Sequence, residues 1–359
     1  MVNDKTSKAY TETTQAEKSE IRQAFGKDER KKIRELFTEI GKVLKDAVEE
    51  IEDSSEKGEL TFEETAGIIT KYLSKINPLL SALYVNSVGK LIRAYQLLLY
   101  SDAVDEFGYD PKFEDFVKPF FRFLYEKWWR VSVEGGENIP SRGRVLFVAN
   151  HSGTLPADGA MIKYYVREIH PSHRDLRPLA ENFVYYLPFI GVLMNRVGGV
   201  RACQENAEIL LMRDEAVLVF PEGVKGIVKH FSLRYKLQRF GRGGFVKLAI
   251  KTRSPMLPVA VVGAEEIYPV VARFDSIGKM INLPTLPIVL NMFLLGPFGF
   301  IPFPSKWYIK FGKLMRQTAE LPPEAVEDDI LINQISQEVR ANIEDMIAEL
   351  LSKRKSIWK

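Results

Sequence analysis

A buried-strand pattern that ends in a histidine is the feature of this chain with the clearest chemical meaning. The run Val145–Ala149 is apolar, and Asn150 and His151 follow it directly. An uninterrupted apolar run is typical of a strand buried on both faces of a parallel sheet. Ligands bind at the carboxyl ends of such strands, which favours His151 as a general base. Asp158 supplies a carboxylate that can fix the imidazole tautomer, although the same residues also suit a polar turn that caps the next helix.

Two further blocks place charge beside an apolar segment, and a third block has only the pattern of a strand. The segment Ala216–Phe220 runs into Pro221-Glu222-Gly223-Val224-Lys225, and Arg201 ends a block that follows another apolar stretch. Pro255–Gly263 has the pattern of a further strand. The content and order of the four blocks resemble the glycerolipid acyltransferase family over roughly residues 130–315.

The resemblance implies a role for each matching residue. His151 would deprotonate the hydroxyl of the acceptor, and Asp158 would orient it. Glu222 and Gly223 match the block that shapes the acceptor site in the family. Arg201 matches the basic residue of the second block, and Lys225 follows the third, so both are candidates for substrate binding.

The chain departs from the family pattern at two points. Six residues separate His151 from Asp158, two more than is usual in the family, so the added residues would have to bulge out of the turn. Val224-Lys225 stands where Thr-Arg is common. Lysine keeps the positive charge but loses the planar fork that grips a phosphate, which weakens the expectation of a phosphomonoester acceptor.

Acyl transfer from a thioester needs a base, an oxyanion stabiliser and alignment, so we expect no metal or prosthetic group. The co-substrate would be acyl-CoA or an acyl carrier protein. Four histidines and one cysteine, without CxxC or HExxH spacing, fit this expectation. Ser152 beside His151 leaves a serine hydrolase as an alternative, but the GxSxG motif is absent and a packing role is favoured.

The net charge of +3 hides a strongly basic segment. Between Gly223 and Ala264 there are nine lysines or arginines and no acidic residue. A solvated basic face is the usual meaning of such a run. Because this one follows the candidate site, donor phosphates, an acidic carrier-protein helix and anionic lipid headgroups are candidate partners. Nucleic acid is not expected, since no known binding module is present.

The pattern along the 359 residues predicts a polar mobile arm at 1–30 and a helical N-terminal region at 31–130. A catalytic domain at 131–320 and a C-terminal helix within 321–359 would follow. We expect an α/β fold with a mostly parallel central sheet flanked by helices. The N-terminus lacks the apolar core of a secretory signal, so the cytoplasmic face of a membrane is the expected location.

A charge-free segment at Met280–Ser305 suggests how a lipid substrate could be reached. Five prolines and two glycines interrupt it, which makes a straight membrane-spanning helix improbable. It could dip into one leaflet, line an acyl-chain groove or pack in the core. Trp128 and Trp129, flanked by Lys127 and Arg130, favour a membrane interface but also suit core packing.

The sequence therefore predicts a peripheral or monotopic acyltransferase. The leading acceptor is a lysophospholipid such as 1-acyl-glycerol-3-phosphate, and the alternative is a neutral glyceride or another alcohol. A non-catalytic protein that binds membrane lipids is the alternative from a different class.

Overall fold

The computed structural model describes residues 104–152, 156–186, 190–274 and 285–358, together with eight residues between 46 and 72. The chain divides into two units, Met1–Tyr95 and Gln96–Lys359. In the first unit the eight described residues are all helical, and Lys71 Nζ lies 2.7 Å from a carboxylate oxygen of Glu50. The predicted arm at 1–30 lies outside the described residues.

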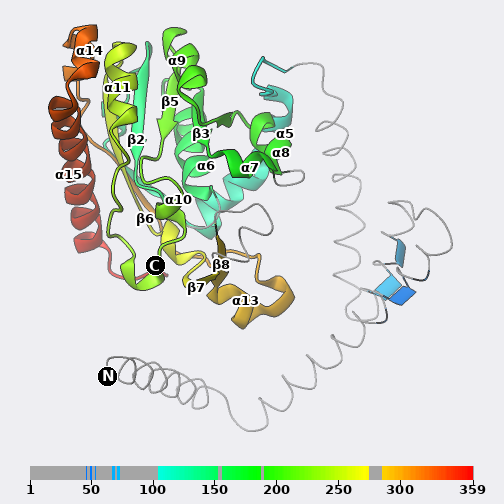
Figure 1. Ribbon diagram of the computed structural model, residues 1–359. Helices are drawn as coiled ribbons and strands as arrows, with labels where there is room; N and C mark the ends of the chain where they lie inside the picture. Colours follow the sequence, from blue (N-terminus) through cyan, green and yellow to red (C-terminus); the bar gives the residue numbers. More distant parts are fainter. Residues whose placement is uncertain are drawn as a thin grey trace, which may run out of the picture. The chain divides into compact units, whose positions relative to one another are not determined.

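A seven-stranded sheet forms the centre of the second unit, in the order β1-β9-β6-β2-β5-β3-β4 (Figure 1). The pairs β6-β2, β2-β5, β5-β3 and β3-β4 are parallel, and β9 runs antiparallel to β6. The strands are β1 (Ser132–Glu134), β2 (Val145–Ala149), β3 (Leu176–Ala180), β4 (Val200–Arg201), β5 (Ala216–Val219), β6 (Met256–Val262) and β9 (Tyr308–Phe311). The mostly parallel α/β fold predicted from the sequence is confirmed.

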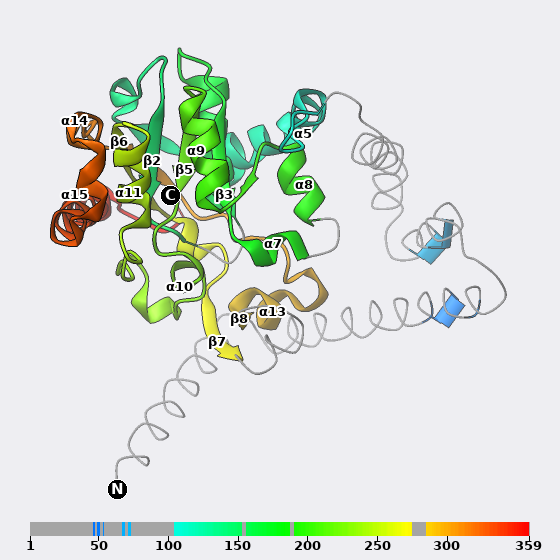
Figure 2. The same ribbon diagram turned by 45° about the horizontal axis from the view of Figure 1, so that its top comes forward.

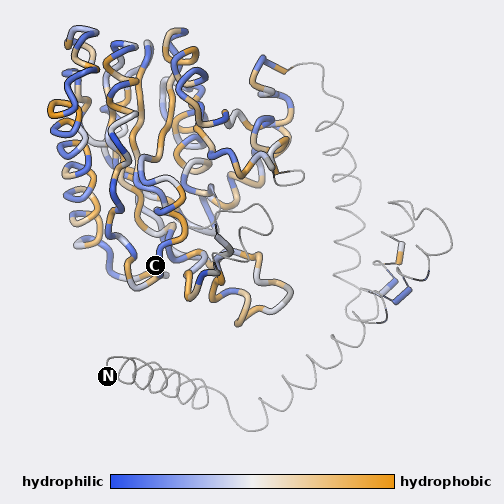
Figure 3. Tube along the Cα trace, in the orientation of Figure 1, coloured by the Kyte–Doolittle hydropathy of each residue, from blue (hydrophilic) through white to orange (hydrophobic). Residues whose placement is uncertain are grey.

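Helices cover both faces of the sheet because successive side chains of each buried strand alternate between the faces. Phe147 packs with residues of α6, whereas Leu146 and Val148 pack with residues of α9, α11 and α15. Figure 2 shows the two helical layers, and in Figure 3 the central strands are largely hydrophobic. These helices are α6 (Ala157–Tyr164), α9 (Gln204–Met212), α11 (Gly244–Lys251) and α15 (Asp329–Lys353).

Helix α5 (Pro111–Phe123) begins where Asp110 accepts hydrogen bonds from the backbone nitrogens of Lys112 and Phe113. It continues into a π-helical turn, Leu124–Trp128. The predicted interfacial position is wrong for Trp129, which is 2% exposed and stacks on Trp307 at 4.6 Å between ring centroids. Its Nε1 donates a hydrogen bond to Phe303 O, so the polar N–H of the indole also has a partner within the fold.

The charge-free segment contributes β8 (Leu286–Val289) to a second, two-stranded sheet. The other strand of this sheet is β7 (Val270–Phe274). The charge-free segment continues through α13 (Leu290–Leu295) and a short 3-10 turn, Gly296–Phe298. Asn291 fastens α13 by donating from its amide to Ile267 O and Ile301 O. We call residues 286–301 the apolar hairpin. No helix within the described residues is long and apolar enough to cross a bilayer.

Candidate active site at the carboxyl ends of β2 and β5

His151 is held at the carboxyl end of β2 by the residue before it. The Asn150 side chain is buried and pairs with the main chain of the neighbouring strand β6. Its Oδ1 accepts from Val261 N at 2.7 Å, and its Nδ2 donates to Val261 O at 3.0 Å. A side-chain amide can satisfy both groups of one residue in this way, so β2 and β6 stay joined where their ladder ends. The sequence reading assigned Asn150 no role.

His151 and Asp158 are in direct contact, and we call this pair the dyad. Asp158 lies in the first turn of α6, and its Oδ2 is 2.7 Å from His151 Nδ1. The carboxylate is 0% exposed and also accepts from the backbone nitrogens of Ser152 and Gly159 at 2.9 and 2.8 Å. A carboxylate oxygen accepts hydrogen bonds, so the ring nitrogen that faces it acts as the donor. The proton of the neutral imidazole then lies on Nδ1, which leaves Nε2 as the basic atom.

The six-residue spacing between His151 and Asp158 therefore keeps the two side chains together. The imidazole is 13% exposed and stacks on Phe220 with 4.2 Å between ring centroids. Ser152 is 1% exposed, and among the residues that the structure describes its hydroxyl has no hydrogen-bond partner. A serine nucleophile must contact its base, so this geometry disfavours the serine hydrolase alternative.

Glu222 follows the neighbouring strand β5 and ties the two strand ends together. Its side chain is fully buried. Oε1 accepts from His151 N at 2.9 Å, and Oε2 accepts from Gln238 N at 2.6 Å. The carboxylate thus holds the main chain that carries the imidazole. Gly223 has φ +54°, a backbone conformation that glycine adopts without strain.

Arg201 and Lys225 are both exposed. Arg201 ends β4, and its Nε donates to Asn182 Oδ1 at 2.6 Å. The strand order β2-β5-β3-β4 puts three strand spacings of ~4.8 Å, about 14 Å in all, between the ends that carry His151 and Arg201. The row of carboxyl strand ends therefore carries His151 after β2, Glu222 after β5 and Arg201 at the end of β4, in this order.

The basic segment is only partly a free surface. Lys229 is buried with Glu222 and Glu265, and Lys247 and Lys251 pair with Asp329 and Glu208. The remaining cations are exposed: Lys225, Arg234, Lys236, Arg239, Arg242 and Arg253. The run of charge gave no signal that one lysine is internal, because its carboxylate partners lie outside the run.

Gly226, in the short helix α10 (Val224–Ile227), packs directly against Glu222 and His151. A Cβ added there would lie 2.9 Å from Glu222 Cβ and 3.0 Å from both Cβ and O of His151. We expect Gly226→Ala to displace His151, costing about 1–3 kcal/mol of stability and lowering turnover. Thermal unfolding and kcat measure the two effects. Gly241→Ala is the matched control, since a Cβ at Gly241 meets nothing within 4 Å. Equal behaviour of the two variants would contradict this packing.

The apolar hairpin lies at the same end of the domain as the dyad. It follows β6, whose carboxyl end adjoins that of the parallel strand β2. Figures 1 and 2 both show α13 at the end of the sheet where α10 lies. Large apolar side chains are exposed on the hairpin: Met292, Phe293, Leu294, Phe298, Phe300 and Ile301.

Comparison with known proteins identifies the family. A family model described as Acyltransferase matches residues 130–262. Uncharacterized proteins of Mycobacterium bovis and Mycobacterium tuberculosis are 42% identical over 279 residues, which is 76% of this chain and 78% of theirs. Phytyl ester synthase 1 of Arabidopsis thaliana is 27% identical over 249 residues, 62% of this chain and 34% of that protein.

Among solved structures, the 1-acyl-sn-glycerophosphate acyltransferase PlsC of Thermotoga maritima aligns with a TM-score of 0.44 and 18% identity, over 81% of this chain and 99% of that one. The family match spans β2, β5 and β6 together with both dyad residues. The chain therefore belongs to the acyltransferase family, as its resemblance to glycerolipid acyltransferases predicts, and it is an acyltransferase.

Proposed function

We propose that the enzyme transfers a fatty acyl group from an acyl thioester to a hydroxyl of a glycerolipid, with His151 as the general base. The observation that carries this proposal is the 2.7 Å contact between His151 Nδ1 and Asp158 Oδ2 at the end of β2. It leaves Nε2 as the ring atom that can accept a proton. A thioester is already activated, so the proposal includes no metal or prosthetic group.

In the proposed step the imidazole alone accepts and returns the proton. Nε2 of His151 takes the proton of the acceptor hydroxyl while the oxygen of that hydroxyl attacks the thioester carbonyl. The C–O bond forms, the C–S bond breaks, and the imidazolium returns the proton to the thiolate that leaves. Asp158 stabilises the imidazolium and keeps the ring oriented, and Glu222 keeps its main chain in place.

The leading acceptor is a lysophospholipid such as 1-acyl-glycerol-3-phosphate. Exposed Arg201 and Lys225, near the edge that carries His151, support an anionic acceptor. The names of two relatives support the alternative of a neutral alcohol or glyceride. One is the phytyl ester synthase, and the other is a Bos taurus enzyme that synthesises storage lipids, 26% identical over 133 residues, 37% of this chain and 38% of that protein.

A competition assay separates these acceptors. Purified enzyme receives equimolar lysophospholipids, monoacylglycerol, diacylglycerol and a long-chain alcohol, with acyl-CoA or acyl carrier protein as donor. Mass spectrometry then identifies the acylated products. A phospholipid product supports the first proposal, and a neutral ester supports the second. Absence of any product with either donor would leave the non-catalytic lipid-binding alternative.

We expect neutralisation of the exposed cations to act through acceptor binding. Arg201→Gln and Lys225→Gln remove charge without touching the dyad, and each lost charge-assisted hydrogen bond is worth about 1.5–3 kcal/mol, roughly 10- to 10²-fold in KM. The expected result is a raised KM for a phosphomonoester acceptor and an unchanged KM for monoacylglycerol. Lys112→Gln on α5 is the surface control. Equal KM values in all variants would remove these cations from the site.

The enzyme is proposed to work at the cytoplasmic face of a membrane, as a peripheral or monotopic protein. The apolar hairpin supports this location, since Phe293 is 69% and Phe300 70% exposed. Contiguous exposed apolar surface is typical of membrane or protein contact sites. The exposed Lys225 of α10, at the same end of the domain (Figures 1 and 2), would meet anionic headgroups.

A further inference from the structure

Lys229 is an internal lysine placed between two buried carboxylates. Its side chain is 4% exposed. Nζ lies 2.9 Å from Glu265 Oε1 and 3.7 Å from Glu222 Oε2, and it donates to Lys236 O at 3.3 Å. Burial raises the pKa of Glu265 to about 7, against the opposing influence of Lys229. A buried ammonium group is stable only with such partners.

The Lys229 ammonium group is also the counter-ion of Glu222. Its carboxylate is fully buried and receives two backbone N–H groups, from His151 and Gln238. Lys229 is the one cation within 4 Å of Glu222 among the described residues. Without it, Glu222 would face Glu265 in a poorly solvated site. A buried carboxylate that loses its cation is repelled by the second carboxylate, and its displacement weakens the hydrogen bond that it accepts from His151 N.

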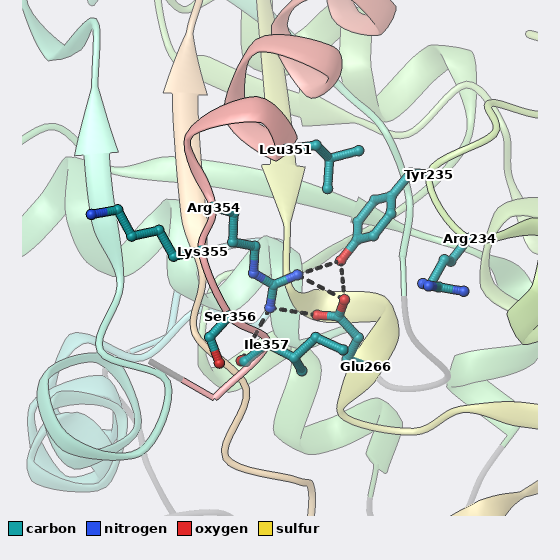
Figure 4. A pocket seen from close by; sticks show the side chains of 8 residues that line it. All are labelled: Arg234, Tyr235, Glu266, Leu351, Arg354, Lys355, Ser356 and Ile357. Atoms are coloured by element: carbon teal, nitrogen blue, oxygen red, sulfur yellow. Dashed lines mark hydrogen bonds and ion pairs between the residues drawn. The ribbon is translucent and has the colours of Figure 1, made fainter.

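The other side of Lys229 is fixed to the frame of the domain. Both oxygens of Glu265 accept from Tyr235 N at 3.1 Å. The Tyr235 hydroxyl donates to Glu266, which pairs with Arg354 at the end of α15 with two 2.7 Å contacts (Figure 4). The turn after β6 and the C-terminal helix end therefore hold Glu265 and Tyr235 in place. Lys229 connects this fixed network to Glu222.

We propose that Lys229 is a positioning residue for the catalytic base: it holds the Glu222 carboxylate in place, and Glu222 holds the main chain of His151. This inference rests on the proposed function of His151. Lys229 touches neither the dyad side chains nor, in the proposed reaction, the substrates. Its loss should therefore slow the chemical step and spare substrate binding.

The kinetic test compares Lys229→Met with Lys229→Arg, which keeps the charge. A displaced base costs up to about 10²-fold, so we expect kcat of Lys229→Met to fall 10- to 10²-fold, with KM for donor and acceptor unchanged. Lys229→Arg should recover most of kcat. Lys251→Met is the matched control, because Lys251 also pairs with a glutamate but is 62% exposed. Lys229→Gln replaces the Met variant if that protein does not fold.

A second measurement does not need activity. The chain has four histidines, so selective nitrogen-15 labelling of histidine gives four backbone amide signals, and His151→Ala identifies one of them. The His151 N–H donates to the Glu222 carboxylate, and we expect its proton signal to move upfield in Lys229→Met and to stay in Lys251→Met.

The two measurements separate the possible outcomes. A fall in kcat together with a shifted His151 amide supports the proposal. An unmoved amide, an unchanged kcat or an effect confined to KM overturns it. Should the wild-type protein transfer no acyl group, the proposed function fails, and the amide signal alone decides whether Lys229 holds His151.

Discussion

His151→Ala should reduce kcat for acyl transfer by at least ~10²-fold, the contribution expected of a lost general base. The imidazole is 13% exposed, and within the described part of the chain its one side-chain hydrogen bond is to Asp158. Its removal should therefore leave the sheet intact. The effect is measured as the initial rate with a thioester donor, divided by the amount of folded enzyme. Circular dichroism gives the folded fraction. Near-normal turnover in a folded variant would exclude His151 as the base.

Asp158→Asn tests the orienting role in the same assay. An amide nitrogen cannot accept the proton of Nδ1, so the ring would turn or change tautomer and Nε2 would lose its basicity. The carboxylate also accepts from Ser152 N and Gly159 N, so its loss disturbs the turn as well. We expect turnover to fall with His151 still present. Full activity of Asp158→Asn would mean that the ring needs no such partner.

Replacing Phe293, Leu294 and Phe300 by serine should release the protein from lipid vesicles. Inserting three such side chains contributes about 1.5–3 kcal/mol each, so vesicle affinity should fall by at least ~10³-fold. These are among the most exposed apolar residues of the hairpin, whereas Leu295 is half-buried and is left unchanged. Sedimentation with vesicles measures the affinity. Activity on a bilayer acceptor should fall with it.

The control for this prediction is a short-chain acceptor that dissolves in water. Turnover on it should persist, since the hairpin side chains that change point away from the core. Ile330→Ser, on the exposed side of α15 and 74% exposed, is the matched surface variant and should bind vesicles normally. Equal losses on both acceptors would assign the hairpin a structural role. Unchanged vesicle binding would assign the anchor to another part of the chain.

Much of this fold could be predicted from local patterns. The apolar runs that became β2, β5 and β6 are buried on both faces, so the strands of a parallel sheet were legible without tertiary information. The start of α5 is also encoded locally, because Asp110 is an N-cap residue and Pro111 occupies the first helical position. Trp129 was harder, since the same aromatic run suits a membrane interface or a core.

The sequence by itself predicted the residues of the candidate site: a histidine at the end of one buried strand, a carboxylate near it, and charge at the end of the next strand. Only the tertiary structure decided that Glu222 grips the main chain of His151, that Asn150 joins β2 to β6, and that Lys229 is internal. Each of these depends on partners 71 to 111 residues away or on burial between packed elements. A linear pattern records the type of a side chain and its neighbours, whereas strand order and packing decide which distant group it meets.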